Sequence, residues 1–148
     1  MRTTTLSDFH AELIATGAYR THDDCRPARR ARPGALTTLR YTWGTIRVFP
    51  YCAVAEPLGR LTTERWANAC FSSITAAERL GMCVSVEGFA DRLACKGPVV
   101  YLCNHMSMTE TIMLPPTLVA AGSFSYVAKA SLAHLPFLEH AADRKSVV

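Results

Sequence analysis

Residues 99–110, which read VVYLCNHMSMTE, are the part of this chain from which the fold is predicted. The five mostly apolar residues 99–103 are typical of a strand buried on both faces of a sheet. The run ends abruptly in Asn104-His105, and a polar turn then leads into a segment with helical character. A strand end holds a side chain rigidly, and a helix start can orient a second group. The turn between a strand and a helix is therefore a common place for catalytic residues.

The segments before this stretch predict helices. Residues 63–80 carry apolar side chains at helical spacing, with Thr62 or the following threonine as the cap and Gly81 at the end. A second, short helix is expected within residues 6–20. Residues 21–35 combine two prolines, a glycine and crowded charges, so a linker is expected there.

Strands are expected on both sides of residues 99–110. Residues 82–88 alternate in character and end in a glycine, and residues 123–128 centre on two aromatic side chains and a valine. A helix is expected over 110–114, where Pro115-Pro116 interrupts or ends it. This order predicts an α/β fold with a mixed, largely buried sheet flanked by helices and incomplete at the C-terminus.

The net charge of +4 is placed unevenly along the chain. Residues 1–50 carry eight arginines against four acidic residues, which gives +4, whereas residues 51–148 carry eight basic and eight acidic residues. A basic segment attracts an anionic membrane surface or a nucleic acid, and a solvated arm without a partner explains it equally well. The arginines between 26 and 32 have no interleaved aromatic residues, so no nucleic acid partner is expected.

An apolar patch at residues 36–54 mixes aromatic side chains with Arg40 and Arg47. It is too short and too charged to span a bilayer, and no ordinary transmembrane helix is expected elsewhere. The mixture suits a segment that lies in a membrane interface, while a helix or strand packed on the domain body accounts for it equally well. The six cysteines are scattered without a Cys-x-x-Cys pair, which favours reduced thiols in a cytosolic setting over disulfides or a zinc site.

His105 and Glu110 are the candidate catalytic pair. A neutral imidazole can take a proton from an alcohol, and a carboxylate on its other ring nitrogen fixes the tautomer. Five positions on a regular helix are about 140° apart, so the two can meet only if His105 precedes the helix and Glu110 lies in its first turn. Ser107 is a suitable cap for such a helix. Ser107 and Glu110 also form a capping-box pattern, however, which explains both residues without any chemistry.

Residues 103–111, CNHMSMTET, resemble the His-x4-Asp/Glu block of the glycerolipid acyltransferase family, whose best-known members are the 1-acylglycerol-3-phosphate (lysophosphatidate) acyltransferases. Residues 79–93, RLGMCVSVEGFADRL, and 97–102, GPVVYL, are similar to the blocks that precede it in that family. Residues 126–137, YVAKASLAHLPF, are similar to a block that follows it. Because these features occur in the family's order, the match is far more specific than the His–Glu pair alone.

The resemblance implies direct acyl transfer in phospholipid biosynthesis. An acyl-CoA or an acyl-carrier protein would supply the thioester, and a lysophospholipid, with lysophosphatidate as the leading case, would supply the hydroxyl. His105, oriented by Glu110, would deprotonate that hydroxyl, while Asn104 and Ser107 would support the turn. Lys129 would be a candidate for contact with phosphate or substrate, or else a solvated charge at a strand end. No metal or other cofactor is implied, and the enzyme would work at the cytoplasmic face of a membrane, bound peripherally or in the interface.

The sequence departs from the family in its second half. The Phe-Pro-Glu-Gly-Thr-Arg block that the family associates with the acceptor phosphate has no counterpart here, and Glu139 stands where the family has a glycine. The last six residues, 143–148, can be encoded by a common sequencing adapter read in frame. We therefore expect an N-terminal fragment of an acyltransferase, inactive alone, that ends in a non-native tail.

Four regions are expected along the chain. These are a basic N-terminal arm and linker at 1–35, an apolar, interfacial helical segment at 36–80, the N-terminal half of an acyltransferase domain at 81–142, and the non-native tail at 143–148. A rival hypothesis makes the chain a non-catalytic membrane-surface or interaction module that uses the Arg-rich and aromatic residues of 29–54.

Overall fold

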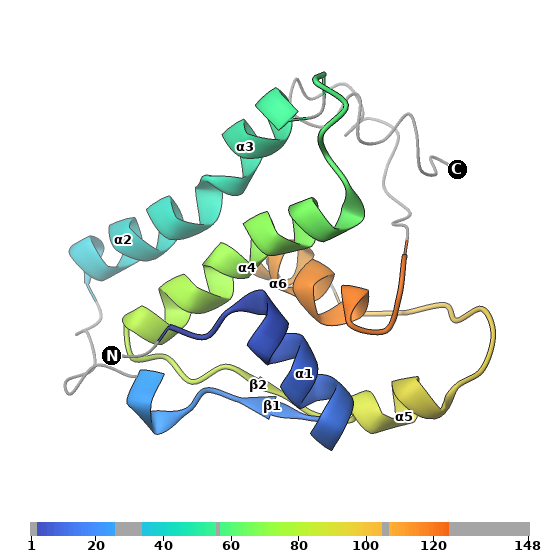
Figure 1. Ribbon diagram of the computed structural model, residues 1–148. Helices are drawn as coiled ribbons and strands as arrows, with labels where there is room; N and C mark the ends of the chain where they lie inside the picture. Colours follow the sequence, from blue (N-terminus) through green and yellow to red (C-terminus); the bar gives the residue numbers. More distant parts are fainter. Residues whose placement is uncertain (1–2, 26–33, 56, 105–106, 125–148) are drawn as a thin grey trace.

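The computed structural model describes residues 3–25, 34–55, 57–104 and 107–124, and these are mostly helical (Figure 1). In chain order the elements are α1 (Leu6–Thr16), β1 (Tyr19–Arg20), the short 3-10 helix η1 (Asp23–Cys25), α2 (Ala35–Ile46), α3 (Val48–Ala55), α4 (Thr63–Arg79), β2 (Ser85–Val86), α5 (Phe89–Ala94) and α6 (Met108–Val119).

Helix α4 is the element against which most of the others pack. It contacts α2, α3 and α6, and Figure 1 shows it running through the middle of the described elements. Its N-cap is Thr62, whose hydroxyl oxygen accepts a hydrogen bond from the Arg65 N–H at 3.2 Å. Gly81 follows the helix with a φ of 80°, as expected for a glycine at a helix C-terminus. The predicted helix over residues 63–80 is therefore confirmed, together with its cap.

Helix α1 begins with a capping box and ends at a glycine. The Asp8 N–H donates to Thr5 Oγ1 at 3.1 Å, and the Thr5 N–H donates to Asp8 Oδ2 at 3.3 Å. Gly17 then adopts a φ of 71°, so the chain turns out of the helix and into β1. The helix expected within residues 6–20 is confirmed as far as Thr16, and the residues after it are not helical.

The sheet is much smaller than the sequence predicts. β1 and β2 pair antiparallel, with Tyr19 opposite Val86 and Arg20 opposite Ser85, and helices lie beside this pair (Figure 1). Tyr19 is buried, but Arg20 and Ser85 are exposed. The described residues thus combine helices with a sheet, as expected, while the prediction of a largely buried, mixed sheet is wrong.

The apolar run 99–103 is neither a strand nor a helix, which corrects the prediction made for it. Val100 and Leu102 are 85% and 94% exposed. A β-prone segment becomes a strand only where a neighbouring strand completes its backbone hydrogen bonds, and β1 and β2 pair with each other instead. Of the strand expected at 123–128, the first two residues are irregular and the others lie outside the described residues.

Helix α6 runs through Pro115 and Pro116, where an interruption was expected. Each proline removes one backbone donor from the helix, which normally costs about 3 kcal/mol or more. Both rings are fully buried, and the His10 ring Nε2–H donates to the Pro116 carbonyl oxygen at 2.7 Å. Thr117 Oγ1 donates to the Met113 carbonyl oxygen at 3.4 Å. We infer that burial of both rings offsets this cost, while the two side-chain contacts add hydrogen bonds to other carbonyls of the same helix, those of Pro116 and Met113.

Two clusters of buried side chains form the core. The first joins α1, β1, α4 and α5 and consists of Phe9, Leu13, Tyr19, Phe71, Ile74 and Phe89. The second joins α3, α4 and α6 and consists of Val48, Cys52, Cys70 and Ile112.

Residues 36–54, for which a membrane interface and a packed helix or strand were both considered, form α2 and most of α3. Among the elements described, no helix is both long and apolar enough to cross a bilayer.

Candidate active site at the start of helix α6

The predicted catalytic turn leads into helix α6, whose N-cap is Ser107. Asn104 and Cys103 are exposed and belong to the irregular segment before the turn. Cys103 was expected to be a buried strand residue, and this is wrong because the segment forms no strand. His105 lies outside the described residues, as does Lys129, so their positions are not compared with those of the other candidates.

Ser107 and Glu110 form a capping box. The Thr109 N–H donates to Ser107 Oγ at 3.1 Å, and the Ser107 N–H donates to Glu110 Oε2 at 2.7 Å. The sequence pattern of this box is therefore confirmed in the structure. Two backbone donors at the helix start are satisfied in this way, and the Glu110 carboxylate lies next to the positive end of the helix, where a negative charge is favoured.

The geometry agrees with one requirement of the His–Glu hypothesis. Glu110 lies in the first turn of α6, and the helix begins at Met108, three positions after His105. A single regular helix that included both position 105 and Glu110 would instead place them on different faces. Glu110 is half-buried.

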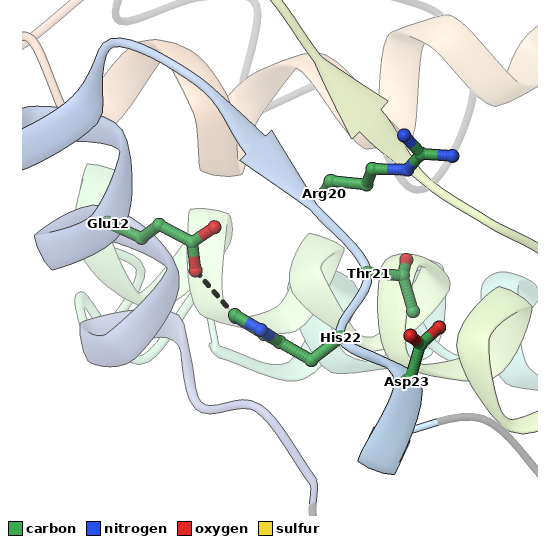
Figure 2. A pocket seen from close by; sticks show the side chains of 5 residues that line it. All are labelled: Glu12, Arg20, Thr21, His22 and Asp23. Atoms are coloured by element: carbon green, nitrogen blue, oxygen red, sulfur yellow. Dashed lines mark hydrogen bonds and ion pairs between the residues drawn. The ribbon is translucent and has the colours of Figure 1, made fainter.

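An open cavity of about 460 Å³ lies elsewhere, between α1 and the segment that follows β1. Its lining residues are Glu12, Arg20, Thr21, His22 and Asp23, shown in Figure 2. The Glu12 side chain extends from α1 toward His22, and His22 Nε2 lies 2.7 Å from Glu12 Oε2 (Figure 2). Both charge signs are present around the cavity, and the His22 and Glu12 side chains are 52% and 27% exposed.

Sequence reasoning missed this His22–Glu12 pair. The residues are ten positions apart, and His22 falls in a segment expected to be a linker. They meet because Gly17 ends α1 and turns the chain back along it. Of the predicted site residues that the structure describes, none lines this cavity. Within the described ranges, no three His, Cys, Asp or Glu side chains gather where they could hold a metal ion.

Comparisons with family models, curated proteins and solved structures gave no match to this chain.

Proposed function

We propose that residues 103–111 form the catalytic turn of an O-acyltransferase that acylates a lysophospholipid, with lysophosphatidate as the leading acceptor. The observation that carries the proposal is the place of Glu110 in the first turn of α6, at the third helical position behind the Ser107 cap. This position, together with a helix that begins after His105, is what a histidine–carboxylate pair at this spacing requires. The resemblance of residues 79–137 to the glycerolipid acyltransferases supports the same chemistry.

In the proposed reaction His105 acts as the general base. Its neutral imidazole takes the proton of the acceptor hydroxyl while the hydroxyl oxygen attacks the thioester carbonyl of an acyl-CoA or an acyl-carrier protein. The carbon–sulfur bond then breaks, the ester is complete, and the departing thiolate takes the proton back from the imidazolium. No acyl-enzyme forms, and the residues of the chain supply base and orientation only.

Glu110 has a positioning role in this reaction. A carboxylate hydrogen-bonded to the second ring nitrogen of His105 would hold the base in the right tautomer and stabilise the imidazolium that forms. Asn104 and Ser107 would shape the turn, and Lys129 would contact the phosphate or another part of the substrate. Because the acceptor is a lipid, the reaction would take place at the cytoplasmic face of a membrane, with the protein bound peripherally or in the interface.

The experiment is an acyl-transfer assay with lysophosphatidate as the acceptor, carried out once with oleoyl-CoA and once with an oleoyl-acyl-carrier protein as the donor. It is run on this chain and on the complete product of its reading frame in the source DNA, because the acceptor-phosphate block of the family has no counterpart in residues 1–148. We expect phosphatidate from the complete product, and His105→Ala should lower the rate by about 10²–10⁴-fold, the usual contribution of a general base.

His22→Ala is the matched control, because His22 is an exposed histidine of a separate cavity. It should leave the transfer rate unchanged. The proposal is wrong if the complete product transfers no acyl group from either donor type, or if His105→Ala is as active as the parent. A non-catalytic interaction module, the rival hypothesis, predicts one of these two results.

A further inference from the structure

Helix α2 packs on α4 through one narrow side. A Cβ atom added to Gly44 would lie 2.6 Å from the Cβ of Ala76, so the two helices approach closely at this glycine. The Ser72 hydroxyl of α4 donates a hydrogen bond to the Gly44 carbonyl oxygen at 3.1 Å, so the two helices are also hydrogen-bonded at this glycine. None of the residues of α2 is fully buried, and most of them are exposed.

The side of α2 that faces away from Gly44 is apolar. Leu36, Leu39, Trp43 and Ile46 are 61%, 64%, 67% and 47% exposed. With 100° between successive residues, these four side chains fall within an arc of about 80°, whose centre lies about 120° from Gly44 on the helical projection. We call them the α2 stripe. Single exposed apolar residues need no explanation, but four on one helix face, with a tryptophan among them, indicate a binding surface.

Two arginines border the α2 stripe. Arg40 and Arg47 are exposed and lie about 20–40° from one edge of the stripe on the helical projection. Residues 25–55 hold six arginines and no aspartate or glutamate. The surface is therefore complementary to an apolar partner that carries negative charge at its border.

We propose that the α2 stripe, with Arg40 and Arg47, docks this protein on the surface of an anionic lipid bilayer. An apolar helix face that contains a tryptophan and is bordered on one side by arginines is the pattern of a helix lying in the plane of a membrane interface. Its 12 residues span only about 18 Å, which is short of the roughly 30 Å hydrocarbon core, so α2 lies on the bilayer and does not cross it.

A second copy of this chain fits the surface less well. Two stripes facing each other about a two-fold axis would bring the arginines of both copies to one interface, where like charges oppose association. Lipid phosphates instead neutralise both arginines while the acyl chains take up the apolar side chains. The inference rests on the exposed face of α2 and not on the proposed acyl transfer, so the two can fail separately.

Trp43 provides a direct probe of docking. Trp66→Phe leaves Trp43 as the only tryptophan of the full chain. We expect its emission to shift to the blue on addition of vesicles of phosphatidylglycerol and phosphatidylcholine, and to be quenched by brominated lipid in the same vesicles. Pure phosphatidylcholine vesicles should bind much more weakly, because each arginine near an anionic surface contributes about 1 kcal/mol, which corresponds to roughly fivefold in affinity.

Matched variants separate the stripe from the general surface. Leu39→Ala with Ile46→Ala should weaken sedimentation with anionic vesicles roughly tenfold or more, whereas Leu93→Ala with Ile14→Ala, an exposed pair on α5 and α1, should not. Circular dichroism of each variant verifies that the helices are retained.

The charges are tested in the same assay. Arg40→Ala with Arg47→Ala should weaken binding roughly 30-fold at low salt, and Arg79→Ala with Lys96→Ala, which removes the same charge elsewhere, should have a much smaller effect. The proposal is overturned if Trp43 emission is unchanged by anionic vesicles, if the stripe and control pairs lose binding equally, or if the stripe variants convert a dimer to a monomer in sedimentation velocity without changing vesicle binding.

Discussion

Glu78 of α4 accepts a hydrogen bond from the Tyr19 hydroxyl of β1 at 2.5 Å, and both side chains are buried. The same carboxylate oxygen, Oε1, accepts from Thr21 Oγ1 at 2.9 Å. Thr21 in turn holds Val84, whose N–H donates to Thr21 Oγ1 at 2.8 Å. One acidic side chain on the central helix thus fixes the N-terminal strand, and through it the segment that precedes β2.

Removal of the Tyr19 hydroxyl should therefore destabilise the fold. Tyr19→Phe leaves a buried acceptor on Glu78 with one partner fewer, and we expect a loss of about 1–3 kcal/mol in the free energy of unfolding. Urea unfolding followed by circular dichroism measures this loss. Tyr51→Phe is the control: Tyr51 is 43% exposed, so its change should stay within about 0.5 kcal/mol. Equal effects at the two positions would contradict the role given to Glu78.

The turn after α1 requires glycine for two separate reasons. Gly17 has a φ of 71°, and a Cβ atom added there would lie 2.5 Å from Ala90 Cβ and 2.9 Å from the Ala90 backbone nitrogen. Gly59 has a similar φ of 64° but open space around it. Gly59→Ala should cost about 1 kcal/mol from the left-handed backbone alone, and Gly17→Ala should cost clearly more. Thermal unfolding of the two variants compares them, and an equal loss would show that the approach of α5 to Gly17 is not close.

High pH should unfold the protein partly through Cys70. Burial, and to a smaller extent the neighbouring Cys52, raises the pKa of the Cys70 thiol from 9.0 to about 12. The unfolded chain then loses this proton at lower pH than the folded chain, so the contribution of Cys70 to stability is fully present below pH 9 and is lost as the pH rises toward 12. The effect on the free energy of unfolding should approach about 1.4 kcal/mol per pH unit within that window.

Cys70→Ala removes this titrating group. The slope of stability against pH between 9 and 12 should therefore be shallower in the variant than in the parent, whatever its stability at neutral pH. Iodoacetamide at pH 8 gives an independent readout: Cys83, Cys95 and Cys103 are exposed and should be alkylated in the folded protein, while Cys70 should react only after unfolding. Identical slopes in the parent and the variant would contradict the raised pKa.

Local signals in the sequence predicted the helix ends well. Thr62, Gly81 and the Ser107–Glu110 box act through backbone groups within a few residues of themselves, so their patterns can be read from the chain alone. The same signals do not specify partners that are far away in sequence. The strand at Tyr19 exists because it pairs with residues more than 60 positions later, and nothing near Tyr19 indicates this.

The predictions for residues 99–103 and for the two prolines failed because tertiary structure, and not local preference, determines the conformation of both segments. The β-prone run 99–103 lies exposed, since strand propensity has no effect without a neighbouring strand. Pro115 and Pro116 remain within α6 because their rings are buried in the core. For the candidate site, the capping box was predictable from spacing, whereas the His22–Glu12 pair depends on the reversal of the chain at Gly17 and has no signature of its own.

Glu110 either orients a base or only caps a helix, and Glu110→Gln separates these roles. Glutamine can still accept the Ser107 N–H at the third helical position, so the cap and the melting temperature should be retained, but a neutral amide cannot stabilise an imidazolium. The measurement is the rate of phosphatidate formation by the complete product of the reading frame, parent against Glu110→Gln. We predict a loss of about 10²–10⁴-fold at an unchanged melting temperature. A variant that transfers acyl groups at the parent rate would contradict the catalytic assignment and leave Glu110 as a capping residue alone.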